Sequence, residues 1–486
     1  MDLLLISALP FLGAIAIGLA ARAPRKVHAV IAGLFTLAAL ALVLVKAPAV
    51  LAGEIATTRI DWVPAIGLNA HYFMDPLGLM FAGLILGIGF LIVVYANSYL
   101  SAADSSARFL TFLMLFQGAM LGIVLSDNVL MLLVFWEMTS LSSFLLIGFW
   151  GHLAEGRQGA RMALAVTGGG GLALIAGLVL LGRIAGSYDL TQILLAKDAV
   201  QASPLYPVAL VLILLGCFAK SAQFPFHFWL PHAMAAPTPV SAYLHSATMV
   251  KAGVFLIARL WPVLSGTDLW FHLVATTGLV TMLIGAGVAL FKNDLKALLA
   301  YSTVSQLSYI VLGAVMLTPM AMVGGIIHIA GHALSKITLF FCAGSIYCAS
   351  RRKKISDLAG IGRKLPWTMA AFFIGSLGMI GVPPSGGFIS KWYLVMGSVD
   401  AREMVFLAVL LVSSVLNAAY FLPITYTAFF EKESAGPVGD GPDAIAPDDI
   451  REIPLVVIPL VATAFLSLVM GVFPGYFLIL AGGVVP

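Results

Sequence analysis

The chain alternates between apolar stretches of about 20 residues and short polar segments along its whole length. A helix of that length crosses the hydrocarbon core of a bilayer and satisfies its own backbone hydrogen bonds there. The pattern therefore predicts an all-α polytopic membrane protein with about 14 transmembrane helices. We expect the spans near residues 2–21, 28–46, 75–97, 109–126, 129–150, 161–182, 205–223, 239–261, 270–290, 297–316, 320–348, 367–395, 403–430 and 454–476.

Proline and glycine interrupt two of these spans, the seventh and the twelfth. The seventh is followed by Pro225, Pro231 and Pro237, and the twelfth contains Pro383 and Pro384. Proline removes a backbone donor, so such a break survives in a membrane only where protein or water satisfies the freed groups. The two broken spans lie five apart and must cross the bilayer in opposite directions. This layout predicts two inverted five-helix repeats, spans 4–8 and spans 9–13.

The spans divide the chain into segments. Residues 1–108 hold spans 1–3, residues 109–262 the first repeat, residues 263–430 the second repeat, and residues 454–486 span 14 and the C-terminus. Residues 431–453 are rich in Gly, Pro and Asp, and we expect a flexible acidic loop there. No basic residue precedes the first apolar run, which predicts a retained span and not a cleaved signal peptide.

Composition excludes a soluble globular protein, because 61% of the 486 residues are hydrophobic and only 10% are charged. Loops after odd-numbered spans hold sixteen Lys and Arg residues, whereas loops after even-numbered spans hold six. The positive-inside rule then places the odd-numbered loops in the cytoplasm and both termini outside, in a bacterial-type inner (plasma) membrane. The net charge of +4 reflects this loop bias and does not indicate nucleic-acid binding.

Four lysines lie well inside apolar segments, where basic residues are rare. They are Lys220, Lys251, Lys336 and Lys391. None is an arginine, and a desolvated lysine can release its proton whereas an arginine effectively cannot. Four titratable cations inside a membrane protein suggest a proton path, and each lysine is a candidate proton-transfer residue.

Glu137 is the one acidic residue that cannot be assigned to a loop or to the end of a span. A charge at the bilayer centre costs about 2.5–3.5 kcal/mol on insertion scales, and a paired base reduces that cost. We expect the partner to be Lys220, the first buried lysine that follows. A fixed ion pair that only locks helices together is the alternative.

Histidines accompany the buried lysines. His245 and Lys251 are six residues apart, roughly 240° around a continuous helix, so water or a third group must join them. A neutral structural histidine is the alternative for His245. His328, His332 and Lys336 recur every four residues and form one polar stripe on a helix, which suits a proton relay. Packing or a metal site are the alternatives, but no carboxylate or thiolate is evident for a metal.

Lys391 follows the break in the twelfth span, where it is either the terminal gate of the path or a side chain that extends to the outer interface. His227 and His232 flank Pro231 near the cytoplasmic end of the seventh span. We predict that they mark proton access, with loop packing as the alternative. The three cysteines lack a C-x-x-C spacing, so we expect no disulfide, zinc or iron–sulfur cluster.

Long segments around these residues resemble a known family. They include Phe-Trp-Glu137-Met-Thr-Ser, Lys220-Ser-Ala-Gln-Phe-Pro, His245-Ser-Ala-Thr-Met-Val-Lys251 and Phe-Ile-Ser-Lys391-Trp. Over nearly its whole length the chain resembles the antiporter-like subunits, which are the large Mrp-type cation/proton antiporter subunits and the related proton-pumping subunits of respiratory complex I. Spans 5 and 8 are similar to the A-type large subunit of Mrp, whereas the chain length and the loop 353–363 are similar to the D-type one.

The resemblance implies a proton-transfer chain made of Glu137, Lys220, His245, Lys251, His328, His332, Lys336 and Lys391. It also implies partner membrane subunits of a Mrp-type or complex I-like assembly, transport of H⁺ with Na⁺ or K⁺, and no cofactor. We therefore expect a proton-translocating subunit of a Mrp-type Na⁺(K⁺)/H⁺ antiporter, a component of a transporter more than a stand-alone enzyme.

Three alternatives stay open. The first is a proton-pumping subunit of a complex I or hydrogenase-type redox complex, which iron–sulfur subunits would accompany. The second is an energising subunit of a bicarbonate uptake complex, which a zinc-containing soluble partner would accompany. The third is a non-conducting scaffold, which would tolerate methionine at all four buried lysines.

Overall fold

The computed structural model describes residues 2–432 and 449–484, so most of the predicted acidic loop at 431–453 lies outside the described residues. Within the described part, twelve helices are long and apolar enough to cross a membrane. The predicted seventh and twelfth spans contribute two shorter apolar helices, Tyr206–Lys220 and Pro366–Ile380. The prediction of an all-α, multi-pass membrane protein is confirmed.

The N-terminal part contains three long helices and a small hairpin. The helices are α1 (Asp2–Leu19), α2 (Arg25–Leu51) and α3 (Pro76–Tyr99). The hairpin lies between α2 and α3 and consists of β1 (Ala56–Thr58), η1 (Pro64–Ile66) and β2 (Tyr72–Met74). Its strands are antiparallel, with Thr57 opposite Phe73.

The region predicted as the first repeat begins with three long helices and ends with two half-length ones. Its elements are α4 (Ser106–Leu125), α5 (Val129–Ile147), α6 (Ala154–Ala185), α7 (Leu190–Leu195), α8 (Lys197–Ala202), α9 (Tyr206–Lys220), η2 (Phe226–Phe228), α10 (Trp229–His232), η3 (Ala233–Ala235), α11 (Thr238–Ser246) and α12 (Met249–Leu264).

The region predicted as the second repeat also contains a helix in two halves. Its elements are α13 (Asp268–Ala289), α14 (Leu295–Val315), α15 (Pro319–Ser350), η4 (Ile355–Asp357), η5 (Ile361–Arg363), α16 (Pro366–Ile380), α17 (Gly386–Asp400) and α18 (Met404–Phe430). The chain continues with α19 (Pro454–Val472) and α20 (Gly475–Gly482).

Side-chain caps determine where several spans begin. The Asp75 carboxylate accepts the backbone N–H of Gly78 at 2.8 Å at the start of α3. Asn128 caps α5, and Asp294 caps α14. Each cap satisfies a backbone donor that has no partner inside the helix, which explains why the chain turns into a helix at these polar residues.

The structure places breaks where prolines predict them. Helix α9 ends at Lys220, and short helical turns follow up to Ala235. Helices α16 and α17 are separated by residues 381–385. The eighth span is broken as well, between α11 and α12, which the sequence did not predict. The inverted repeat itself stays a prediction.

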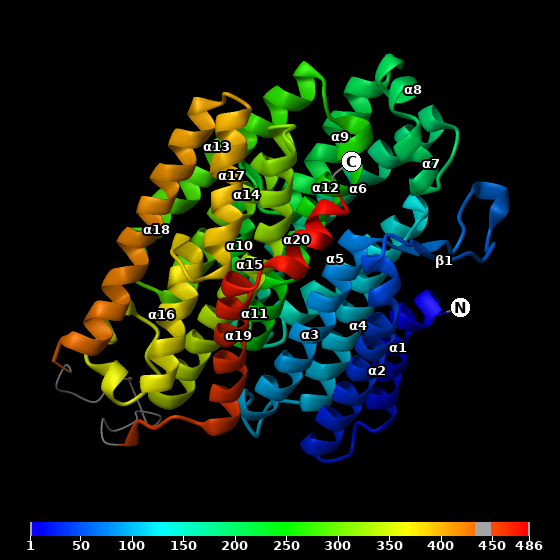
Figure 1. The fold of residues 1–486 in the computed structure, drawn as a ribbon. Coiled ribbons are helices and arrows are strands. Elements are labelled where there is room, and N and C mark those ends of the chain that lie inside the picture. Colours follow the sequence, from blue (N-terminus) through cyan, green and yellow to red (C-terminus); the bar gives the residue numbers. More distant parts are fainter. Residues whose placement is uncertain (1, 433–448, 485–486) are drawn as a thin grey trace.

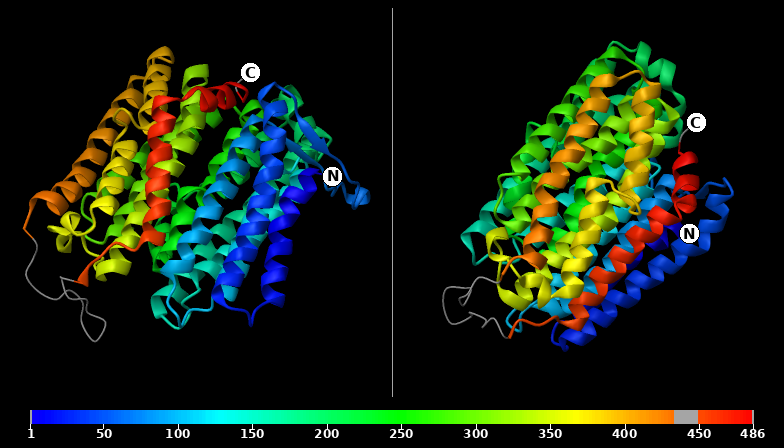
Figure 2. Two further views of the ribbon diagram at one scale, coloured as in Figure 1. Left: turned by 60° about the horizontal axis from the view of Figure 1, so that its bottom comes forward. Right: turned by 60° about the vertical axis from the view of Figure 1, so that its left-hand side comes forward.

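The helices form one bundle with α15 at its centre. In Figures 1 and 2, α1 and α2 lie on one lateral side of the bundle and α18 lies on the opposite side. Helix α19 runs between them. Helix α15 packs against α11, α14, α16, α17 and α19, and its central stretch is completely buried. The polar positions of this helix are therefore shielded from the surroundings on every side.

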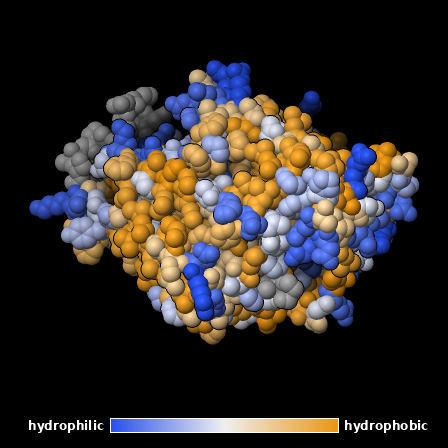
Figure 3. All heavy atoms as spheres, turned by 90° about the horizontal axis from the view of Figure 1, so that it is seen from above, coloured by the Kyte–Doolittle hydropathy of each residue, from blue (hydrophilic) through white to orange (hydrophobic). Residues whose placement is uncertain are grey.

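Hydrophobic residues also cover much of the outside. Figure 3 shows large apolar areas on one face, with hydrophilic residues gathered in separate patches. The outward-facing apolar side chains include Leu172 on α6, Val415 on α18 and Phe465 on α19. A surface of this kind suits a lipid or protein environment better than water.

Candidate functional site

All four lysines singled out by the sequence are buried in the bundle. Lys220 ends α9, Lys251 lies in the first turn of α12, Lys336 is in the middle of α15, and Lys391 is in α17. Their exposed fractions are 0% for the first three and 6% for Lys391. Within the described residues, no carboxylate oxygen lies within 4.0 Å of any of these amines. The four amines donate hydrogen bonds to hydroxyl and carbonyl oxygens instead.

The Lys220 amine hydrogen-bonds to a hydroxyl group of α5 and not to the carboxylate that the sequence led us to expect. Its Nζ donates to Ser140 Oγ at 2.9 Å and to the Trp136 carbonyl at 3.4 Å, and it lies 5.2 Å from the centre of the Trp136 ring. Within the described residues, the Lys220 amine and the Glu137 carboxylate are not within 4.0 Å of each other, so their pairing stays a prediction. Ser140 lies one turn beyond Trp136 on the face of α5 that meets Lys220.

Glu137 lies in the middle of α5 and packs against α6. One of its carboxylate oxygens is buried and has no hydrogen-bond partner within the described residues. A Cβ atom at Gly171 would overlap that oxygen, so only glycine leaves room for the carboxylate. The glycine run 168–171 thus allows a close approach, although Gly168 and Gly169 themselves face open space.

The central site of the eighth span is built across a helix break. His245 belongs to α11 and Lys251 to α12, so the rotation predicted for one continuous helix does not apply. Thr248 donates its hydroxyl to the Tyr243 carbonyl at 2.7 Å, which also accepts the backbone N–H of Ala247 at 3.4 Å. Lys251 Nζ donates to the Ile329 carbonyl of α15 at 2.5 Å. The break therefore directs this lysine at α15.

The predicted stripe on α15 is present. The rings of His328 and His332 are 6.1 Å apart, and both side chains are 1% exposed. The His328 Nδ1 atom hydrogen-bonds to Ser390 Oγ of α17 at 2.8 Å. Lys336 Nζ donates to Ser302 Oγ of α14 at 2.8 Å. The stripe therefore connects laterally to α17 and α14.

Lys391 points back toward the break that precedes it. Its Nζ donates to the carbonyls of Met379 and Ile380 at 2.8 and 3.1 Å, which are the last carbonyls of α16. It also donates to Ser414 Oγ at 3.2 Å and to Tyr309 OH at 3.4 Å. The alternative that Lys391 extends to the outer interface is therefore wrong, because the open helix end binds the ammonium group internally.

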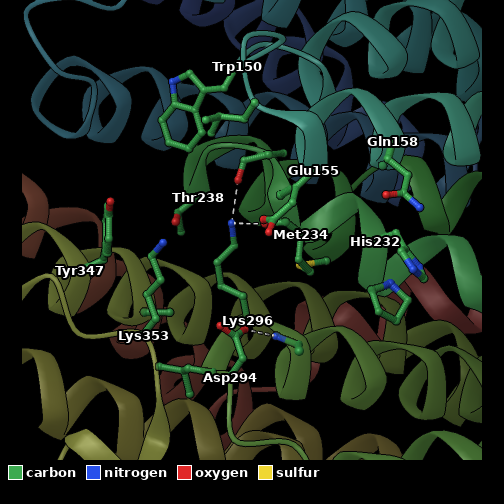
Figure 4. A pocket seen from close by; sticks show the side chains of 18 of the residues that line it. Trp150, Glu155, Gln158, His232, Met234, Thr238, Asp294, Lys296, Tyr347 and Lys353 are labelled. Carbon is green, nitrogen blue, oxygen red and sulfur yellow. Dashed lines mark hydrogen bonds between the residues drawn. The ribbon is translucent and has the colours of Figure 1, made fainter. Parts of the chain in front are cut away.

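A cavity of about 370 Å³ opens at the end of the bundle that carries the loops after the odd-numbered spans. Figure 4 shows His232, Glu155, Lys296 and Tyr347 among the side chains around it. His232 lines this cavity, whereas His227 stacks on Phe224 instead, at 5.9 Å between ring centres. The structure thus separates the two histidines that the sequence grouped together.

Arg259 is a buried cation that was not predicted from the sequence. It is one of the six cations counted with the loops after even-numbered spans, but it lies inside α12 and is 5% exposed. Its guanidinium binds the Asp75 carboxylate with two contacts of 2.5 and 2.8 Å. Burial opposes ionisation of Asp75, but Arg259 and the Gly78 N–H together hold its pKa below its usual value. The signal in the sequence that could have indicated this pair is Asp75, which Pro76 follows at the start of α3.

Two family descriptions match the chain. Residues 126–417, more than half of the chain, match "NADH:quinone oxidoreductase/Mrp antiporter, TM". Residues 62–110 match "NADH-Ubiquinone oxidoreductase (complex I), chain 5 N-terminus". The first match covers the helices that carry all four buried lysines.

Curated relatives are antiporter subunits. The chain is 52% identical over 344 residues to the A/B-type subunit of a probable K⁺/H⁺ antiporter of Rhizobium meliloti, which is 71% of this chain and 34% of the relative. It is 44% identical over 367 residues to the A-type subunit of a Na⁺/H⁺ antiporter of Alkalihalophilus pseudofirmus, which is 72% of this chain and 46% of that relative. The chain thus spans a third to a half of the length of these relatives.

Solved structures share the fold. A chain of the Mrp complex from Dietzia sp. superposes with a TM-score of 0.86 and 32% identity over 99% of this chain and 52% of that chain. A chain of an archaeal membrane-bound sulfane sulfur reductase superposes with a TM-score of 0.85 over 98% of this chain and 76% of that chain. Its identity is 22%, so this second likeness shows the fold alone.

Proposed function

Since the chain belongs to the NADH:quinone oxidoreductase/Mrp antiporter family, we propose that it is a proton-translocating subunit of a multi-subunit Mrp-type antiporter. The observation that carries this proposal is the set of four buried lysines, which contact hydroxyl and carbonyl oxygens and, among the described residues, no acid within 4.0 Å. A lysine without a fixed counter-ion can change its charge at a lower cost than one locked in an ion pair. The exchanged cation is Na⁺ or K⁺, as the names of the two relatives suggest.

The proposed path follows the order of the buried groups through the bundle. Protons enter from the cavity beside His232 and pass to Lys220 and Lys251. They continue along α15 through His328, His332 and Lys336. They leave near Lys391, at the break between α16 and α17. Lys251 supports this order because its amine reaches α15 within one residue of His328.

Glu137 is proposed to tune Lys220. The carboxylate sits one helix position beyond Trp136, whose carbonyl and ring the lysine already contacts. A change of rotamer brings the amine toward the carboxylate or returns it to Ser140. The first position holds the proton on Lys220, and the second leaves the amine in a less polar site that favours release. His245 lies between Trp229 and Phe340 and is proposed to pass protons at the central site.

The proposed setting is a bacterial-type inner membrane with both termini outside. The partners are other membrane subunits of a Mrp-type assembly, as the Mrp complex among the structural neighbours suggests. The redox, bicarbonate and scaffold alternatives remain less favoured, because the relatives at 52% and 44% identity are named as cation/proton antiporter subunits.

Replacing Lys220 by alanine tests the proposal in the assembled complex. We expect Na⁺- or K⁺-driven proton exchange in everted membrane vesicles to fall at least roughly a hundredfold, because a positioned proton-transfer group contributes about that much or more. Lys197→Ala is the matched control, since Lys197 is exposed on α8 and should leave exchange unchanged. Exchange at the wild-type rate in Lys220→Ala would contradict the proposal, and tolerance of methionine at all four lysines would favour a scaffold.

A further inference from the structure

The last two lysines of the path share a set of partners that the sequence did not single out. Lys336 donates to Ser302 on α14, and Lys391 donates to Tyr309 on α14 and Ser414 on α18. Within the described residues, no hydrogen bond joins either lysine to His328 or to another histidine. The side chains that lead from one lysine to the other therefore belong to α14 and α18.

Polar residues line the facing sides of these two helices. On α14, Ser302, Ser305 and Tyr309 recur at intervals of three and four residues, which places them on one helix face. All three are completely buried. The stripe runs from the contact with Lys336 at one end to the contact with Lys391 at the other.

Helix α18 presents a matching face. The polar residues on this face are Ser413, Ser414, Asn417 and Tyr420. Asn417 and Ser413 are completely buried, and Tyr420 is 4% exposed. The rest of this helix is largely apolar, with Val415 and Tyr426 facing outward. Together with the three residues of α14, we call these four the polar ladder.

Hydrogen bonds between side chains of α14 and α18 join the residues of the polar ladder. Tyr420 OH donates to Ser302 Oγ at 3.2 Å and also contacts Asn417 Oδ1. Ser305 Oγ lies 3.3 Å from Ser413 Oγ. Tyr309 OH lies 3.4 Å from Ser414 Oγ. Ser413 also hydrogen-bonds to Tyr309, so within the described residues the remaining gap lies between Tyr420 and the pair formed by Ser305 and Ser413.

We propose that the polar ladder is a second proton relay, which follows the histidine stripe and carries protons from Lys336 on to Lys391. The inference rests on the proposed function, because it names further residues for the same transfer. Each hydrogen bond of the ladder, taken singly, can be explained by the packing of two membrane helices. Such packing does not account for a ladder whose two ends are the ammonium groups of two buried lysines.

The transfer balances without any redox partner. The Lys336 ammonium gives a proton to Ser302, and the hydroxyl proton of Ser302 passes to Tyr420 once the Tyr420 hydroxyl has rotated away from Ser302. Tyr420 passes its own hydroxyl proton through one water molecule to the pair of Ser305 and Ser413. The Ser413 hydroxyl proton then passes to Tyr309, and the Tyr309 hydroxyl proton goes to neutral Lys391. One proton has moved, Lys336 is a neutral amine and Lys391 is an ammonium ion. Asn417 is a positioning residue that orients the Tyr420 hydroxyl.

The test removes one hydroxyl from the ladder. In everted membrane vesicles that contain the assembled complex, we expect Tyr420→Phe to slow NaCl- or KCl-driven proton exchange by about tenfold or more, since it removes the hydroxyl that receives the proton from Ser302. We also expect a larger ratio of rates in H₂O and D₂O, which a purely structural role would not change. Tyr426→Phe is the matched control, because this tyrosine lies on the same helix and is 61% exposed.

Lys336→Ala separates the two proposals. If Lys336→Ala abolishes exchange and Tyr420→Phe keeps the wild-type rate and isotope ratio, the ladder is overturned and the proposed function stands. If Lys336→Ala itself keeps the wild-type rate, the proposed function fails and the ladder fails with it. If Tyr420→Phe does not assemble, Ser302→Ala takes its place with the same two criteria.

Discussion

At the scale of single residues, the buried cations inside the helices of the bundle that are described above fall into two chemical kinds. Arg259 is fixed by a bidentate carboxylate, Asp75, and also lies over the ring of Phe73 at 4.7 Å. The four lysines have weaker oxygen partners and, among the described residues, no acid within 4.0 Å. An arginine in a bidentate pair keeps its charge, whereas an amine held by hydroxyls can change it. The first kind stabilises the fold, and the second is available for transfer.

Loss of the Asp75 carboxylate should destabilise the protein. We expect Asp75→Asn to lower the free energy of unfolding by roughly 3–5 kcal/mol, because it leaves the Arg259 charge buried without its partner. Thermal unfolding of the detergent-solubilised protein measures this change. Asp268→Asn is the control, since Asp268 is exposed at the start of α13. Equal melting temperatures for the two variants would argue against a stabilising pair.

The same pair predicts a pH dependence. The folded state holds the pKa of Asp75 below its usual value, so the stabilisation is present above the unfolded value of about 4. It is lost only as the pH falls through the lower, folded value. We expect the difference in melting temperature between the wild type and Asp75→Asn to stay constant from about pH 6 to pH 8 and to shrink below about pH 4.

At the scale of helices, breaks and close approaches determine where the buried groups point. The breaks near Pro225 and Pro383 could be predicted, because proline cannot complete the backbone ladder. The break between α11 and α12 could not, because no proline marks it. Glycines 168–171 predicted close packing, but only the structure shows that Gly171 faces Glu137.

A methyl group at position 171 should move Glu137 without harming the fold. We expect Gly171→Ala to slow proton exchange several-fold, because the new Cβ overlaps the carboxylate and pushes it away from its position beside α6. Stability should stay within about 1 kcal/mol of the wild type, since alanine favours helices over glycine by that amount.

The glycine run supplies its own control. Gly168→Ala places the methyl group in open space on the same helix, so both exchange and melting temperature should match the wild type. Equal exchange rates for the alanine variants at 168 and 171 would show that the position of the Glu137 carboxylate does not matter for transport.

At the scale of the whole molecule, the apolar pattern was enough to predict the class of fold, and the contacts between spans were not. Ser302 and Lys336 are 34 residues apart, and Tyr95 donates to the carbonyl of Phe341 over 246 residues. The spacing of polar residues along one helix does not show which other helix these residues contact. The partners of the buried lysines could therefore be found only in three dimensions.

Labelling of introduced cysteines tests the predicted orientation. In a chain whose three native cysteines are replaced, a membrane-impermeant maleimide added to intact cells should label Asp198→Cys and not Arg22→Cys. Both positions are exposed. Asp198 belongs to α8 and Arg22 to the connection between α1 and α2, and Figure 1 shows α8 and this connection on opposite faces of the bundle. Everted vesicles should give the opposite pattern, and labelling of Arg22→Cys in intact cells would reverse the predicted orientation.

The two interrupted spans have an electrostatic consequence. Lys391 binds the final carbonyls of α16, so its amine sits at the negative pole of a half-helix dipole, and Lys220 belongs to the last turn of α9, where the same pole acts. Such a pole favours a positive charge by about 0.3–2 kcal/mol. A carboxylate counter-ion vanishes when it takes up a proton, whereas the peptide dipoles keep their direction and size at every pH. The interrupted spans therefore favour the charged form of these two lysines by an amount that proton transfer does not change.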